Sequence, residues 1–455
     1  MTRDNNHTFS LKLAALIGEI YPEVDANILA SQVIDAFFPE GTHRRKRGRV
    51  PGNGQWSERD SLLITYGNGF VDGQHKPLDL LYDFLHRHLN GVIAGVHILP
   101  FFPYTSDDGF SVTDYYAVNP VLGDWADISR IAAEFNLMSD LVLNHVSSQS
   151  NWFNAYLQGH EPYDRFFFEA NPTDDLGSVV RPRTHPLLRE VDTANGPRHV
   201  WCTFSHDQVD LNFANPEVLL EFLRVMRMHV EKGVRIIRLD AVAFLWKEVG
   251  TSCIHLPQTH AIVRLMRLLA DYAIEPVILL TETNVPNAEN LSYFGNRNEA
   301  HSVYNFSLPP LVLHAMMAGT ARVLNRWPGT MPPAQMGCAY LNFTASHDGI
   351  GMRPAEGLLE AEEQARDQVA EQVDLEGEPA LAHGEHRAGL SEPPVLVAAA
   401  LPLATLEIDV LCGHVHHVAR HIGEHLQPVR VLSCGAVVLP IVLGDVQPIF
   451  VDVDD

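Results

Sequence analysis

The sequence predicts an α/β protein built on a (β/α)8 barrel of the TIM type. Seven short, continuous apolar segments recur between residues 61 and 348, and helix-like segments separate them. Strands that are apolar on both faces and alternate with helices form a parallel sheet covered by helices. Seven such units over roughly 290 residues fit this barrel better than an open doubly wound sheet. No GxGxxG or GxxxxGK[ST] motif follows any of the segments, which weakens a nucleotide-binding interpretation.

Residues 1–60 precede the first strand and are predicted to be mainly helical. LKLAALIGEI (11–20) and ANILASQVIDAFF (26–38) carry apolar residues at helical spacing. The basic run HRRKRGR (43–49) stands out in a chain of net charge −24. We favour a solvated helix end or loop for this run over a nucleic-acid or targeting patch, because the rest of the chain is acidic.

The amino-acid composition limits which binding partners and which cellular compartment we expect. The acidic balance argues against nucleic acid and anionic membranes as partners. The five cysteines are odd in number and form no CxxC pair, which is typical of reduced thiols. No segment approaches the roughly 20 apolar residues of a membrane span, and no signal-like stretch opens the chain. We expect a cytoplasmic, soluble protein, and the sequence leaves its oligomeric state open.

The catalytic barrel is expected over residues 61–359. Helical patterns such as 216–233 and 259–275 lie between its strands, and an insertion rich in aromatic residues, Pro and Asp spans 146–205. A long insertion in a βα loop is usually functional, and this one would lie at the face where barrel active sites are built. The seven predicted strands are 61–67, 92–102, 138–145, 234–241, 276–283, 302–307 and 337–348.

Polar side chains gather where these strands end. A single Asp or Asn at such a position is most simply a helix N-cap. Five coincident cases that also include Arg, His and Glu need another explanation, since caps do not call for those residues. In a barrel these ends converge on one mouth. The residues are Asp107 and Asp108 after the second strand, Asn144 and His145 after the third, Arg238 and Asp240 at the fourth, Glu282 at the fifth, and His347 and Asp348 at the seventh.

Glycosyl transfer is the chemistry that fits these groups. It needs one acid to protonate the leaving oxygen and a second carboxylate to trap the oxocarbenium-like centre. Asp240 and Glu282, from adjacent strands, are expected about 5 Å apart, the spacing of a retaining mechanism. Arg238 should keep Asp240 ionised, and the apolar run before Glu282 should raise its pKa. Sugar hydroxyls would bind to His145 and His347 as donors and to Asp107 and Asp348 as acceptors.

Four segments in order, DLVLNH, RIIRLDA, LLTETN and ASHD, resemble the signature regions of the α-amylase family, glycoside hydrolase family 13. GVHILPFFPYTSDDGFSVTDYYAVNP and ETNVPNAENLSYFG are similar to its sucrose phosphorylase subgroup, and especially to the glucosylglycerate phosphorylase branch. The resemblance runs from about residue 10 to residue 359. It implies a retaining α-glucoside phosphorylase, in which phosphate replaces the aglycone of an α-glucoside to give α-glucose 1-phosphate.

The resemblance also implies a role for each matched residue and no cofactor besides inorganic phosphate as co-substrate. The expected catalytic trio is Asp240 as nucleophile, Glu282 as acid/base and Asp348 as transition-state stabiliser. Arg183, in RPRTHP, matches a loop arginine that helps to receive phosphate or an anionic acceptor, with a plain surface arginine as the alternative. The remaining matches are Arg238 orienting the nucleophile, His145 and Asp107 holding the glucosyl ring, Phe110 as its apolar platform, and His347 beside Asp348.

Two departures concern the acceptor side. Sucrose phosphorylases have tyrosine where this chain has Phe244, and histidine where it has Asn284, so fructose is a doubtful leaving group. Many α-amylases use the residue equivalent to Asn144 for calcium, but the subgroup is similar to calcium-free enzymes, so we expect no metal. The alternatives are a hydrolase or transglucosidase of the same family, and a truncated, catalytically impaired sugar-binding remnant.

The resemblance stops near Leu359, before the family's eighth strand. Residues 360–455 contain no Lys, Trp, Tyr or Asn and are dense in Val, Ala, Leu, Glu and His. We hypothesise a frameshift or an unrelated fused segment here, and an unambiguous in-frame junction on resequencing would rule out the frameshift. The segment 429–444 is a candidate substitute strand. His417, His421 and His425 share a helix face and could be interpreted as a metal site, although an accidental spacing is favoured.

Overall fold

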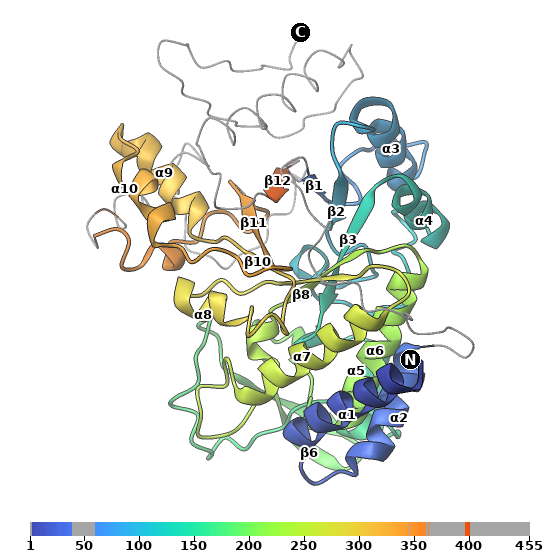
Figure 1. The fold of residues 1–455 in the computed structure, drawn as a ribbon. Helices are drawn as coiled ribbons and strands as arrows, with labels where there is room; N and C mark the ends of the chain where they lie inside the picture. The colour runs from blue at the N-terminus through green and yellow to red at the C-terminus, as the bar shows by residue number, and fades with distance from the viewer. Residues whose placement is uncertain (1, 39–59, 345, 361–362, 364–395, 401–455) are drawn as a thin grey trace.

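A computed structural model describes residues 2–38, 60–344, 346–360, 363 and 396–400 (Figure 1). The basic run 43–49, the histidines 417–425 and the segment 429–444 lie outside the described residues. Within the described part, no helix is both long and apolar enough to cross a membrane.

The core of the molecule is a closed barrel with the strand order β1-β12-β11-β10-β9-β8-β3-β2. All strands except β12 pair in parallel, and they correspond one to one to the seven strands predicted from the sequence. The (β/α)8-type architecture is therefore confirmed. The bounds are β1 Ser61–Thr65, β2 Gly95–Ile98, β3 Asn136–Val142, β8 Ile236–Asp240, β9 Ile278–Thr281, β10 Ser302–Tyr304 and β11 Ala339–Phe343.

The barrel closes with a strand of opposite direction. β12, Leu396–Ala400, pairs antiparallel with both β1 and β11. Its register places Val397 opposite Leu63 and Ala399 opposite Asn342. Among the described residues, a strand from the tail therefore takes the position between β11 and β1.

Helices cover the outside of the barrel. α6 begins after Asn215, whose side chain accepts a hydrogen bond from the Glu217 amide, and α4 begins after Asp124 with a reciprocal capping box. Such caps satisfy backbone donors that the helix leaves unpaired. The helical bounds are α3 Pro77–Phe84, η1 Leu85–Leu89, α4 Trp125–Glu134, α6 Pro216–Glu231, α7 Pro257–Tyr272, α8 Asn287–Ser292, α9 Leu308–Ala318, α10 Arg322–Arg326 and η5 Trp327–Thr330.

The N-terminal segment forms two helices, α1 Thr2–Ile20 and α2 Ala26–Phe37, which pack on α7 and α6 (Figure 1). Between them and the barrel, the Tyr21 hydroxyl donates to the Phe213 carbonyl at 2.9 Å, and its ring lies 6.1 Å from that of Trp246. The N-terminal helices are therefore joined to the segments around the barrel mouth.

The insertion after β3 folds as two small antiparallel pairs. β4 (His145–Ser147) pairs with β7 (Gln208–Asp210), and β5 (Leu188–Thr193) with β6 (Gly196–Trp201). The β4–β7 pair returns the chain to the end of β3, so that Gln208 and Asp210 lie beside His145. The short helices of the insertion and the mouth are α5 Asn151–Leu157, η3 Tyr163–Arg165, η2 Asp107–Gly109, η4 Val242–Phe244 and η6 Arg353–Ala355.

Candidate active site

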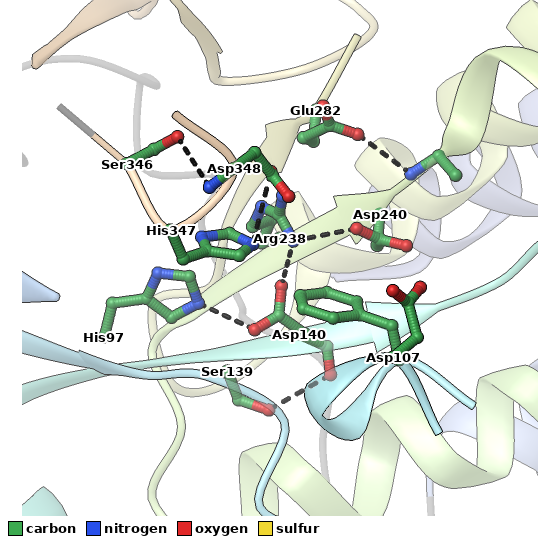
Figure 2. Close-up of polar contacts among 12 residues, drawn as sticks. His97, Asp107, Ser139, Asp140, Arg238, Asp240, Glu282, Ser346, His347 and Asp348 are labelled. Carbon is green, nitrogen blue, oxygen red and sulfur yellow. Dashed lines mark hydrogen bonds and ion pairs between the residues drawn. The ribbon is translucent and has the colours of Figure 1, made fainter. Parts of the chain in front are cut away.

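The residues of β8 point a charged pair into the barrel. Arg238 and Asp240 are two positions apart and so share one side of the strand. Arg238 Nη1 lies 2.8 Å from Asp240 Oδ1 and 2.5 Å from Asp140 Oδ1 (Figure 2). The arginine side chain is 3% exposed. One buried guanidinium thus serves two carboxylates.

Asp140 is a central residue that the sequence analysis missed. It lies in β3 directly opposite Arg238 and is completely buried. Its second oxygen, Oδ2, is 2.7 Å from His97 Nε2 on β2. Burial raises the pKa of Asp140, but the charges of His97 and Arg238 outweigh that effect and hold it well below its usual range. An Asp inside an apolar strand, in register with an Arg of the next strand, was the available signal.

Opposing effects act on the pKa of Asp240. Burial raises its pKa, Arg238 lowers it, and the neighbouring Glu282 and Asp140 raise it further, so that it lies well above its usual range. The ionisation of Asp240 by Arg238 stays a prediction, because Arg238 and burial act on this pKa in opposite directions. The effect of Arg238 has the predicted sign, but the same guanidinium also pairs with Asp140.

Glu282 follows β9 and faces the end of β8. Its Oε2 accepts a hydrogen bond at 3.2 Å from the amide of Ala241, the residue after Asp240. Ala241 is in the left-handed region (φ 50°), a conformation that non-glycine residues adopt mainly at constrained sites. Burial raises the pKa of Glu282, with a further increase from Asp348, which is the predicted direction. Asp240 and Glu282 are thus close enough for the charge of one to act on the other; their 5 Å separation stays a prediction.

The loop after β2 brings two predicted sugar-binding residues to the mouth. Asp107, Asp108 and Gly109 all have positive φ, which folds the loop into a tight turn. Gly109 is needed there, since a Cβ would lie 2.7 Å from the Pro100 carbonyl oxygen. Gln208, also missed in the sequence, donates to Asp107 Oδ2 at 2.7 Å.

His145 and Phe110 line the same part of the site. His145 Nε2 lies 3.1 Å from the Phe110 carbonyl oxygen, to which it can donate. Burial lowers the pKa of His145, which favours the neutral ring. The Phe110 ring stacks on His347 with 5.3 Å between centroids and 4° between planes. The role of Phe110 as an apolar platform for the glucosyl ring stays a prediction.

His347 and Asp348 follow β11. Burial lowers the pKa of His347 to about 4. Asp348 Oδ2 lies 3.2 Å from His347 Nε2, and its amide bonds to the Ser346 hydroxyl. The Asp348 side chain is 64% exposed, in contrast to the 10% of Asp240.

The acceptor-side residues are less closely tied to this centre. Arg183 is exposed on the insertion, and among the described residues no polar contact joins it to Asp240 or Glu282. The Phe244 ring meets the edge of Phe204, 5.5 Å between centroids. Of the nine predicted site residues, the structure gathers all but Arg183.

Lys247 occupies an oxygen-lined position next to the site. Its ammonium donates to Asn144 Oδ1 at 2.8 Å and to the Phe244 carbonyl at 2.9 Å, and pairs with Asp210 Oδ2 at 2.9 Å. Amide, carbonyl and carboxylate oxygens are ligands that calcium also prefers. Here a lysine side chain that is 1% exposed supplies the positive charge. Among the residues that can be described, no cluster of His, Cys, Asp and Glu suits a metal ion.

Comparison with known proteins identifies the family of this chain. The catalytic-domain model of the α-amylase family matches residues 88–342. The chain therefore belongs to the α-amylase family. It is 51% identical over 322 residues to a glucosylglycerate phosphorylase of Spirochaeta thermophila, covering 71% of this chain and 54% of the relative. A glucosylglycerate phosphorylase of Escherichia coli is 45% identical, covering 70% and 56%.

A sucrose phosphorylase of Agrobacterium vitis is more distant, at 33% identity, covering 71% of this chain and 67% of the relative. The fold resembles the crystal structure of a sucrose 6F-phosphate phosphorylase from Thermoanaerobacter thermosaccharolyticum, with a TM-score of 0.63 at 24% identity over 80% of this chain and 74% of that one. The chain spans little more than half the length of the glucosylglycerate phosphorylases that it matches.

Proposed function

We propose that this chain carries the catalytic centre of a retaining α-glucoside phosphorylase. The observation that carries the proposal is the meeting of Asp240 and Glu282 at the ends of adjacent strands, with Arg238 bound to Asp240. The glucosylglycerate phosphorylases among its relatives support the choice of phosphate as acceptor.

The mechanism is a double displacement. Glu282 donates its proton to the glycosidic oxygen while an Asp240 oxygen attacks C1, which releases the aglycone and forms a β-glucosyl ester. A phosphate oxygen then attacks C1, its proton passes to Glu282, and the ester bond breaks to give α-glucose 1-phosphate. The raised pKa of Glu282 suits the first step, in which it must arrive protonated.

The preferred donor in this proposal is glucosylglycerate, before sucrose or its 6′-phosphate and before glucosylglycerol. Phe244 and Asn284 stand where sucrose phosphorylases have tyrosine and histidine, which disfavours fructose. Arg183 remains the proposed contact for phosphate or the carboxylate of the acceptor, at the exposed edge of the insertion.

We also propose that the site works without a metal or another cofactor. Lys247 supports this, because its ammonium holds Asn144, Asp210 and the Phe244 carbonyl together. Exhaustive chelation should leave turnover unchanged. Loss of activity on chelation, restored by a divalent cation, would contradict the proposal.

Phosphorolysis of a panel of α-glucosides by the full-length chain tests the function. We expect α-glucose 1-phosphate from glucosylglycerate only when phosphate is present, and none from Asp240→Asn. Glucose release that does not depend on phosphate would instead indicate a hydrolase or transglucosidase. Sugar binding without turnover, unchanged in Asp240→Asn, would indicate a sugar-binding remnant.

A further inference from the structure

His97 is a buried histidine of β2 that lies outside the signature segments and outside the proposed chemistry. We propose that it is a positioning residue for the nucleophile, acting on Asp240 through Asp140 and Arg238. The inference rests on the proposed function, because it concerns the same carboxylate.

The four side chains form one unbroken chain of contacts from β2 to β8 (Figure 2). His97 Nε2 lies 2.7 Å from Asp140 Oδ2, and Asp140 Oδ1 lies 2.5 Å from Arg238 Nη1. The same Nη1 lies 2.8 Å from Asp240 Oδ1. Each of the first three side chains is at most 3% exposed, so water does not compete for these contacts.

Arg238 bonds to two carboxylates, those of Asp140 and Asp240. In this proposal, His97 sets how the guanidinium is shared between them. His97 bonds to Asp140 Oδ2 and Arg238 Nη1 bonds to Oδ1, so each donor holds one oxygen of this carboxylate. Without the His97 donor, Asp140 would keep a buried, unpaired oxygen, which is costly. The carboxylate could relieve the cost by turning both oxygens toward Arg238, since a guanidinium binds carboxylates well in a two-pronged manner. Arg238 would then be drawn away from Asp240.

Asp140 bonds to His97 from β3, and His347 is close enough for a charge on His97 to affect its pKa. Asp240 is in turn affected by Arg238, Glu282, Asp140 and Asp348. If Arg238 moved toward Asp140, Asp240 would lose the positive charge that lowers its pKa, so Asp240 would deprotonate at higher pH.

The plain alternative is that His97 is a core histidine satisfied by a carboxylate. The same barrel offers a matched control, His301 at the base of β10. His301 is 1% exposed, and its Nε2 lies 3.2 Å from Asp271 Oδ1, a carboxylate of α7 with no contact to Arg238 among the described residues. Asp271 is 29% exposed, and His301 Nδ1 also accepts from the Leu279 amide of β9 at 3.0 Å. Replacing His301 therefore removes a histidine–carboxylate pair that lies away from Arg238.

The test uses the full-length chain and conduritol B epoxide, a glucose-like cyclitol epoxide, without phosphate. An Asp240 oxygen attacks an epoxide carbon and forms an ester, while the epoxide oxygen takes the proton of Glu282 and becomes a hydroxyl. The rate of ester formation on the Asp240 peptide is followed by mass spectrometry from pH 4 to 9. The variants are His97→Phe, His97→Gln, His301→Phe and His301→Gln.

We expect His97→Phe to slow labelling at neutral pH about tenfold, which is the effect of losing one hydrogen bond to a charged group. The fall in the labelling rate at acidic pH should also begin at a higher pH than in the wild type. His97→Gln, whose amide can donate to Asp140 Oδ2, should restore most of the rate. Both His301 variants should label as the wild type does. If His97→Phe fails to fold, His97→Asn takes its place, because Asn is one methylene shorter than Gln. His97→Asn should then show the slower labelling and the shift of its pH dependence.

The inference would be overturned if wild type and His97→Phe showed the same labelling rate and the same dependence of that rate on pH. It would also be overturned if His301→Phe showed the slowing and the pH shift expected of His97→Phe. Equal rates in His97→Gln and His97→Asn would overturn it if His97→Phe cannot be prepared. A labelled wild type that gives no phosphorolysis would refute the proposed function alone. A wild type that is not labelled at Asp240 would overturn the role of Asp240 and this inference together.

Discussion

The two sides of the barrel mouth are built differently. On the side of β2, β3 and β8, Asp240 is 10% exposed and bound through Arg238 and Asp140 to residues inside the barrel. On the side of β11, Asp348 is 64% exposed, and its polar contacts with described residues are the local ones to His347 and Ser346. The first side is organised by the barrel itself, before any sugar binds. The second side, with its exposed carboxylate, is not held by buried ion pairs of this kind.

The largest expected effect comes from the acid that faces the organised side. Glu282→Gln should slow turnover of unactivated α-glucosides by about 10²–10⁴-fold, the usual loss when a general acid is removed. The first step with α-glucosyl fluoride should be almost unaffected, because fluoride needs little help to leave. Steady-state and burst kinetics with both donors would measure this. An equal loss with both donors would mean that Glu282 has another role.

Arg238→Met tests whether the organised side is held by its ion pairs. We expect a loss of about 3–5 kcal/mol in the free energy of unfolding, because buried carboxylates lose their partner. The matched control is Arg87→Met, whose arginine pairs with Asp83 at 2.9 Å on the surface and should contribute less than about 1 kcal/mol. Urea unfolding at neutral pH compares the two variants. Similar losses would contradict the difference between the two environments.

The organised side should also respond to acid through His229, which packs behind β3 against Ser139 and Phe102. Burial lowers the pKa of His229 to about 4 from 6.5. The unfolded chain therefore binds more protons between these values, and stability is lost as the pH falls through them. The loss should reach about 3 kcal/mol at pH 4.

His229→Phe should flatten this part of the stability profile, measured by urea unfolding between pH 4 and 7. The slope of the wild type between pH 6.5 and 4 should be steeper than that of the variant. Parallel profiles would show that another group is responsible.

The smallest expected effect on stability is on the side of β11. Asp348→Asn should change the free energy of unfolding by less than about 0.5 kcal/mol, because an exposed carboxylate with local contacts contributes little. Activity should still fall if Asp348 grips the sugar in the transition state. A stability loss as large as that of Arg238→Met would remove the distinction between the two sides.

Sequence patterns predicted the strands and most of the site because both depend on local order. Continuous apolar runs mark parallel strands, and polar residues at strand ends mark a barrel mouth, so Asp240, Glu282 and Asp107 were found. Asp140, His97 and Lys247 were missed because their importance depends on register and depth. A buried Asp within an apolar run acquires its partner only when β3 lies beside β8. The raised pKa of Asp240 likewise depends on how Arg238 is shared.

The strand β12 has a consequence for the rim of the barrel. Parallel strands all deliver their carboxyl ends, and the loops that follow, to the same rim as Asp240. β12 runs the other way: Leu396 lies opposite Ile64 near that rim, and Ala399 lies opposite Ser61 at the floor. Between β11 and β1 the rim is thus met by the beginning of a strand. Among the described residues, this sector of the rim therefore lacks the carboxyl end of a strand, the position from which β8 and β9 present Asp240 and Glu282.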